Sequence, residues 1–252
     1  MILSAEKILL KHYKDNLHLC VRNVKEKEYI KNKYVHSYQT QLCGCHISEN
    51  MDIDKNIVSD VLLLHDIGRF YEHCHFPNFK HAEFGYKILM QENISDARIL
   101  LPIRYHETEN WLNALSADCV YTSLSQETQK QIKLLCQILI ESDVIANMLI
   151  LTKEKQHNND DVLSLSVPIL ENLFSGKLAD NADIYTEADA IVYILCGLKL
   201  IHLAESKKYI IKYKIINHLI NRLFSFALVT NDVHMKTTVC RIRDYIHTTY
   251  DF

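Results

Sequence analysis

The stretch that decides the fold lies at residues 62–70 and reads Leu62-Leu63-Leu64-His65-Asp66-Ile67-Gly68-Arg69-Phe70. Three leucines lead into a His-Asp pair, a combination that the core of an ordinary helix has little reason to contain. Neighbouring helical residues point about 100° apart, so both side chains can reach one ion placed over their edge of the helix. An imidazole beside a carboxylate is a ligand pair expected for a first-row transition metal. A core histidine bonded to a backbone carbonyl would explain His65 equally well, so the pair alone does not decide between these interpretations.

Further residues with ligand side chains flank this pair. His36 lies upstream, and His81, His106 and Asp143 follow downstream. Asp143 interrupts a long apolar helix that the pattern predicts over residues 127–151. A carboxylate in a buried helix needs a cation or several donors, because burying an unpaired charge is very costly. Asp143 is therefore the best supported ligand after His65 and Asp66.

The order H…HD…H…H…D resembles that of the HD superfamily of metal-dependent phosphohydrolases. The segment His81-Ala82-Glu83-Phe84-Gly85-Tyr86-Lys87-Ile88-Leu89 also resembles the His-x-x-x-Gly-x-x-x-Leu helix of that superfamily's two-metal branch. The similar region runs from about residue 36 to residue 143. The resemblance implies an all-α fold, namely an HD-domain helical bundle with a C-terminal helical extension.

The resemblance also implies a set of metal ligands: His36, His65, Asp66, His81, His106 and Asp143. One site would be formed by His36, His65, Asp66 and Asp143. The two further histidines, His81 and His106, would allow a second ion, with Asp66 as the bridge. We therefore predict one or two divalent transition-metal ions, and mixed imidazole and carboxylate ligands suit Fe, Mn, Co, Ni or Zn without choosing among them. Water bound to such ions loses a proton near neutral pH and becomes a nucleophile.

Gly68 and Arg69, which follow Asp66 in the sequence, support further predictions. Arg69 lies one turn after His65, and its fork of donors matches phosphate oxygens, so we predict that it acts with Asp66 in catalysis. Pairing with Glu72 or Glu83 as part of the scaffold is the competing interpretation. Gly68 is disfavoured inside a helix by ~1 kcal/mol relative to Ala, which indicates close approach of another element or of a ligand. Lys80, Arg104 and Glu107 are weaker candidates and are expected to be solvated.

Length and composition favour one large helical domain. The 252 residues are 48% apolar, and only five Gly and three Pro argue against a turn-rich β protein. We predict a single all-α domain over residues 1–252, with a metal-binding core at about residues 30–150 and a helical extension at about residues 160–252. Residues 153–161 form the only candidate internal boundary.

Local signals also predict several helix ends. Gly44 is expected to stop the helix that carries His36, Asp52 or Asp54 to cap the next one, and Pro102 to open another. The chain after residue 162 reads as four helices, with Thr186 as a cap. This tail is expected to support the core or to form the face of a homodimer.

Charge and cysteine content narrow the partners and the location. The formal net charge of −3 comes without a basic stripe, so no large nucleic-acid surface is expected. No signal peptide is visible, and the uncharged apolar stretch at residues 190–198 is too short to span a bilayer, so we expect a cytoplasmic protein that binds no membrane. The eight dispersed cysteines are expected to be thiols, and the tracts at residues 43–46 and 73–75 lack the spacing of a structural zinc site.

The function predicted first is hydrolysis of a phosphomonoester or phosphodiester, with nucleotide-derived compounds among the candidate substrates. Residues 105–112 lack the Gly-Tyr-Pro signature of the cyclic-dinucleotide branch, and residues 69–72 lack the Glu-Asp of the guanosine-tetraphosphate branch, so neither activity is expected. A di-iron oxygenase of the same superfamily would need the same six ligands, as in proteins similar to myo-inositol oxygenase. A non-catalytic module that binds a metal or nucleotide is the third alternative.

Overall fold

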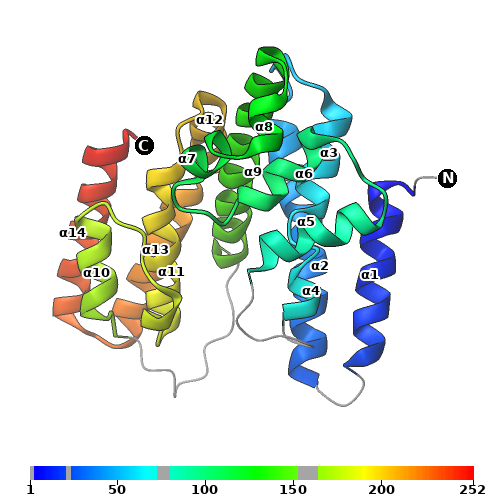
Figure 1. Ribbon diagram of the computed structural model, residues 1–252. Helices are drawn as coiled ribbons and strands as arrows, with labels where there is room; N and C mark the ends of the chain where they lie inside the picture. Colours follow the sequence, from blue (N-terminus) through cyan, green and yellow to red (C-terminus); the bar gives the residue numbers. More distant parts are fainter. Residues whose placement is uncertain (1–2, 21–23, 73–79, 153–163) are drawn as a thin grey trace. The chain divides into compact units, whose positions relative to one another are not determined.

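The computed structural model describes residues 3–20, 24–72, 80–152 and 164–252, and every regular element in them is helical (Figure 1). The described residues contain no strand, which confirms the predicted all-α fold. The chain divides into two compact units, Met1–Asp143 and Val144–Phe252. The boundary predicted at residues 153–161 falls outside the described residues, and the single domain stays a prediction.

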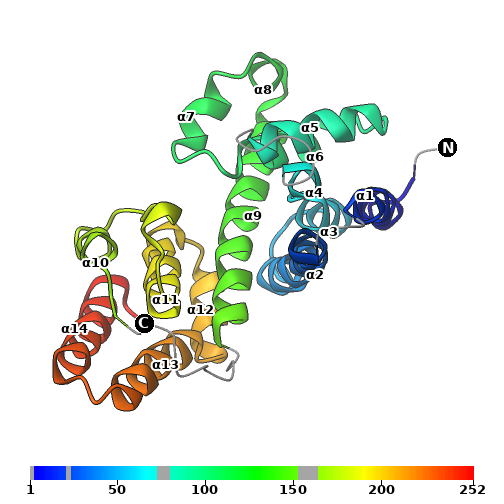
Figure 2. The ribbon, with the colours of Figure 1, turned by 90° about the horizontal axis from the view of Figure 1, so that it is seen from below.

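The first unit contains the His-Asp pair and all the other predicted ligands. Its helices are α1 (Ala5–Leu19), α2 (Val24–Ile47), α3 (Lys55–Leu64), α4 (Arg69–Glu72), α5 (His81–Gln91), α6 (Ala97–Tyr105), α7 (Trp111–Ser116), α8 (Cys119–Ser123) and the part of α9 (Gln126–Thr152) up to Asp143. Helix α3 packs along α2, and α5 packs along α6 (Figure 2). The extent of α9 confirms the long helix predicted over residues 127–151.

Helix α3 delivers the His-Asp pair to the centre of this unit. It begins at the Asp54 cap, whose carboxylate accepts a hydrogen bond of 2.9 Å from the Asn56 backbone N–H, so Asp54 and not Asp52 is the cap. The three leucines at its end are buried, and each buried leucine stabilises the fold by roughly 1.5–3 kcal/mol. The helix ends at Leu64, so His65 and Asp66 lie in the turn that leads to α4.

Gly68 lies directly beneath the start of α5. A Cβ atom at this position would overlap the carbonyl oxygen of His81 and would come within 2.9 Å of the Gly85 backbone nitrogen. The predicted close approach is therefore to another element, α5, and it sets the position of the helix that begins at His81.

Two predicted helix ends are wrong, one because of packing between helices and one because of an earlier cap. Helix α2 continues through Gly44 to Ile47. The glycine serves packing and not a helix end, because a side chain there would overlap Leu62 and lie 2.6 Å from Ser142 Oγ. Pro102 lies inside α6, which begins earlier at the Asp96 cap, where the carboxylate accepts a 2.9 Å hydrogen bond from the Arg98 backbone N–H.

The second unit is likewise helical in its described part. It contains α10 (Val167–Phe174), α11 (Glu187–Cys196), α12 (Ala204–Lys212), α13 (Ile215–Val229), α14 (Val233–Tyr250) and 3₁₀ turns at Asn181–Asp183 and Gly197–Leu200. Five α-helices therefore stand where four were predicted. The predicted Thr186 cap is confirmed, since Thr186 and Asp189 form a capping box at the start of α11.

One helix has the length and composition of a membrane span. Helix α9, unlike the stretch at residues 190–198, is long and apolar enough to cross a bilayer by length and composition alone, but 61% of its most apolar window is buried inside the protein. A core helix passes the same test.

The seven cysteines in the described part of the chain form no disulfide, and the tract at residues 73–75 lies outside the described residues.

Candidate metal centre

The six predicted ligands come together in two clusters within the first unit. The first cluster consists of His36, His65 and Asp143, and the second consists of Asp66, His81 and His106. Within each cluster, one ligand atom from every residue lies within 4.8 Å of the others. Elements far apart in the sequence supply them: α2, the turn after α3 and α9 for the first cluster, and the same turn, α5 and the end of α6 for the second.

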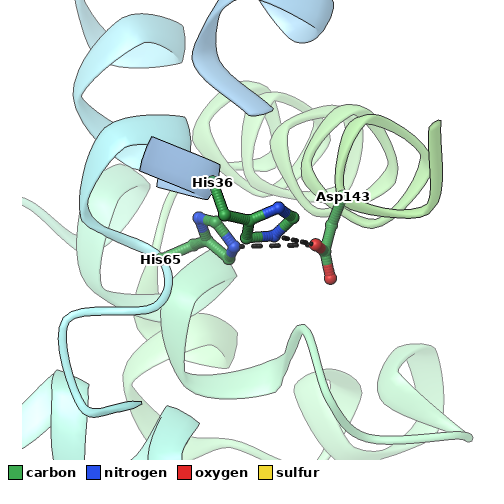
Figure 3. A group of neighbouring side chains, drawn as sticks. All are labelled: His36, His65 and Asp143. Carbon is green, nitrogen blue, oxygen red and sulfur yellow. Dashed lines mark hydrogen bonds and ion pairs between the residues drawn. The ribbon is translucent and has the colours of Figure 1, made fainter. Parts of the chain in front are cut away.

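In the first cluster, two imidazoles point at one carboxylate (Figure 3). His36 Nε2 lies 2.7 Å from Asp143 Oδ1, and His65 Nε2 lies 3.8 Å from the same oxygen. Both histidines are buried, whereas the Asp143 side chain is 29% exposed. Burial would raise the pKa of the Asp143 carboxyl, but the hydrogen bond with His36 and the nearby His65 ring hold that pKa well below its usual range.

His65 presents a lone pair to this cluster. Its Nδ1 lies 2.8 Å from the Leu62 carbonyl oxygen, and because a carbonyl only accepts, Nδ1 carries the proton of the neutral ring. Nε2 is then an acceptor, and it is buried without a hydrogen-bond partner among the described residues. Buried polar atoms are normally satisfied, so this nitrogen suits a bound cation.

In the second cluster both histidines have an acceptor at Nδ1, as His65 has in the first. His106 Nδ1 donates to the Ile103 carbonyl oxygen at 2.8 Å, and His81 Nδ1 lies 2.6 Å from Glu107 Oε2. The two Nε2 atoms face each other at 3.1 Å. In neutral rings these two Nε2 atoms both carry lone pairs, so a cation bound by both lone pairs would stabilise the arrangement.

Asp66 lies between the clusters with one oxygen toward each. Its Oδ1 lies 3.3 Å from His81 Nε2 and 3.8 Å from His106 Nε2, while its Oδ2 lies 3.7 Å from His65 Nε2. Burial would raise the pKa of the Asp66 carboxyl, but Lys33 and His65 hold that pKa well below its usual range. This is the geometry that a bridging carboxylate requires, and bridging itself stays a prediction.

The donor set therefore fits a metal centre. Imidazole nitrogens, among them the unpartnered Nε2 of His65, converge on carboxylate oxygens, and neither cluster contains a thiolate, as expected for Fe, Mn, Co, Ni or Zn. Each cluster could hold one ion, which is compatible with the predicted one or two.

Arg69 adopts one of the two predicted pairings. Its Nη1 lies 2.8 Å from Glu72 Oε2, and its Nε lies 3.5 Å from Asp66 Oδ1. Glu83 pairs instead with Arg104, at 2.7 Å. Arg69 also lines a pocket of about 560 Å³ beside the second cluster, together with Glu72, Lys80, His81, Glu107, Thr108 and Glu109. The role in binding phosphate stays a prediction.

One residue of the site, Lys33, was not predicted, and another, Glu107, was predicted only as a weaker candidate. Glu107, expected to be solvated, is paired with His81, and Lys33 Nζ lies 3.0 Å from Asp66 Oδ2. Two sequence signals were available, since Lys33 is one helical turn before His36 and Glu107 directly follows His106. Burial lowers the pKa of the His81 imidazole. Burial would raise the pKa of the Glu107 carboxyl, but the hydrogen bond with His81 and the neighbouring positive charges together lower it.

Glu107→Ala is expected to weaken metal binding at the second cluster by about 10–100-fold, because it removes the acceptor that orients His81. Glu107→Gln keeps an acceptor and should lose less. Metal titration of the two variants by calorimetry checks this, and equal affinity of wild type and Glu107→Ala would contradict the role assigned to Glu107.

Paired clusters of buried imidazoles and carboxylates on an all-helical scaffold define a class of helical proteins equipped to bind metal. Residues 34–148 match the sequence profile of the HD domain, so the chain contains an HD domain over these residues, as the H…HD…H…H…D order predicted. HD domains are generally metal-dependent phosphohydrolases, and the matched span includes all six cluster residues. Comparison with curated proteins and with solved structures gave no match.

Proposed function

We propose that this protein is a phosphohydrolase that cleaves a phosphomonoester or phosphodiester, using metal ions held by the two clusters. The observation that carries the proposal is the position of Asp66, with one carboxylate oxygen toward each cluster, inside an HD domain. The ligand pattern also suits a di-iron oxygenase or a non-catalytic metal-binding module, so both are outcomes of the test below.

The roles proposed for the chain's own residues follow from their contacts. Ions bound at the clusters would supply a nucleophilic water at neutral pH and polarise the phosphoryl group. His65, His81 and His106 present Nε2 lone pairs because their Nδ1 atoms have acceptors. Arg69, at the edge of the pocket, would neutralise charge on the phosphoryl oxygens. We further propose that the substrate is a small molecule of the cytoplasm.

The test is elemental analysis of protein purified without chelators, followed by a panel of phosphomonoesters and phosphodiesters assayed under air and under nitrogen. We expect two transition-metal ions per chain and hydrolysis that is equal under both atmospheres. Chelator-treated protein should be inactive and should regain activity when the metal is restored.

Other outcomes assign the protein elsewhere. Turnover that requires oxygen would favour the di-iron oxygenase, and full metal content without turnover on any phosphoester would favour the binding module. A single ion, with the second cluster empty, would contradict the two-ion prediction.

A further inference from the structure

Lys33 is the cation in contact with Asp66 that no part of the proposed metal chemistry uses. It lies on α2, one turn before His36, and its side chain is 21% exposed. Its Nζ lies 3.0 Å from Asp66 Oδ2, the oxygen that faces His65. In the described part of the chain, Asp66 is the residue with which Lys33 forms an ion pair.

Lys33 and Arg69 approach Asp66 on different oxygens. Lys33 Nζ contacts Oδ2, whereas Arg69 Nε lies 3.5 Å from Oδ1. Arg69 also has the Glu72 carboxylate to balance its charge, at 2.8 Å, but Lys33 has no such second carboxylate within ion-pair distance among the described residues. Two positive groups from separate helices, α2 and α4, therefore bracket the carboxylate proposed to bridge the ions.

Filling the clusters changes the balance of charge around Lys33. Ions that share Asp66 would draw on the same carboxylate and would repel an ammonium group in contact with it. An ammonium group on a flexible four-carbon stem can turn away, and a nearby anion would balance it. The anion that the proposed reaction brings to this point is the phosphoryl group of the substrate.

We propose that Lys33 binds the phosphoryl oxygens of the substrate, opposite Arg69, when the metal clusters are filled. This inference rests on the proposed function, and it adds a substrate-binding residue from α2 that the HD motif does not contain. Lys33 Nζ contacts Asp66 Oδ2, the oxygen that faces the first cluster, so Lys33 would also compete with a metal ion for this oxygen. Removal of the Lys33 charge should therefore weaken phosphate binding without weakening metal binding, so the two roles can be measured separately.

The variant Lys33→Met removes the charge and keeps the stem, and the probe is inorganic phosphate titrated into metal-loaded full-length protein by calorimetry. We expect the affinity for phosphate to fall about ten-fold or more, as for loss of one charge-assisted contact. Affinity for the metal in the absence of phosphate should be unchanged or higher, because no ammonium group competes for Asp66. Lys33→Arg should restore part of the phosphate binding.

Lys31→Met is the matched control, since Lys31 is exposed on the same helix, and both affinities should stay at the wild-type level. Circular dichroism checks folding, and Lys33→Gln replaces Lys33→Met if that variant does not fold. Unchanged phosphate affinity would overturn the inference, and so would loss of metal from Lys33→Met, which would mean that Lys33 only supports Asp66.

The inference and the proposed function fail in different ways. Hydrolysis by wild type together with normal phosphate binding by Lys33→Met would remove the role of Lys33 and leave the phosphohydrolase in place. Phosphate binding that depends on Lys33, without turnover on any phosphoester, would remove the hydrolase and keep the anion site. Metal-loaded wild type that binds no phosphate would overturn the inference.

Discussion

Asp66→Ala is expected to abolish metal binding at both clusters and to reduce phosphoesterase turnover to near background. The substitution removes the carboxylate whose two oxygens face the two clusters. Two cations bound there would then face each other without the negative charge between them. Loss of this residue should therefore cost more than loss of any one histidine, which belongs to a single cluster.

The same substitution should lower stability even without metal. Asp66 is buried and pairs with Lys33 at 3.0 Å, and removing one partner of a buried ion pair costs on the order of 3 kcal/mol. Elemental analysis, initial rates and thermal unfolding of Asp66→Ala measure the three effects. Asp52→Ala, which removes an exposed carboxylate ahead of α3, is the control and should change none of them. An Asp66→Ala protein with full metal content and turnover would refute the metal centre described above.

The parts of the fold that the sequence could predict are those with local causes. The apolar period over residues 127–151 corresponds to a helix observed at Gln126–Thr152, because a buried helix needs apolar residues on most of its surface. The Asp54 and Thr186 caps were predictable because their side chains accept hydrogen bonds from residues two or three positions ahead.

The two wrong helix ends have different causes, one in the packing between helices and one in a cap nearer the start of the helix. Gly44 carries the signal of a helix stop, but the structure uses its missing side chain to let Leu62 and Ser142 approach α2. Pro102 carries the signal of a helix start, but the Asp96 cap begins that helix earlier. In both cases a local preference of about 1–3 kcal/mol was overridden by packing or by a better cap.

The candidate site shows the same division. The six clustered residues have ligand side chains in a recognisable order, so the sequence could nominate them, and the structure brings them into two clusters. Lys33 and Glu107 have ordinary side chains, and only the tertiary structure reveals their contacts with Asp66 and His81. The choice of Glu72 over Glu83 by Arg69 also depends on tertiary structure, since Arg104 already occupies Glu83.

Gly68→Ala is expected to displace the start of α5 and to release the metal from the second cluster while the first keeps its ligands. The new methyl group would overlap the His81 carbonyl oxygen and crowd the Gly85 backbone nitrogen at 2.9 Å. Backbone atoms cannot rotate away as a flexible side chain can, so the helix itself has to move. His81 is the first residue of that helix, and a shift there separates its imidazole from Asp66 and His106.

Overpacking of this kind costs about 1–3 kcal/mol, so the midpoint of thermal unfolding should fall by several degrees. Metal content should drop from two ions toward one, and turnover should fall with it. Gly197→Ala is the matched control, because its methyl group would meet only the Val144 side chain, at 3.0 Å, in the second unit. That variant should lose some stability and keep both ions. If Gly68→Ala keeps two ions and the wild-type unfolding midpoint, then α5 is not held where its contact with Gly68 places it, and the position of His81 in the second cluster has another cause.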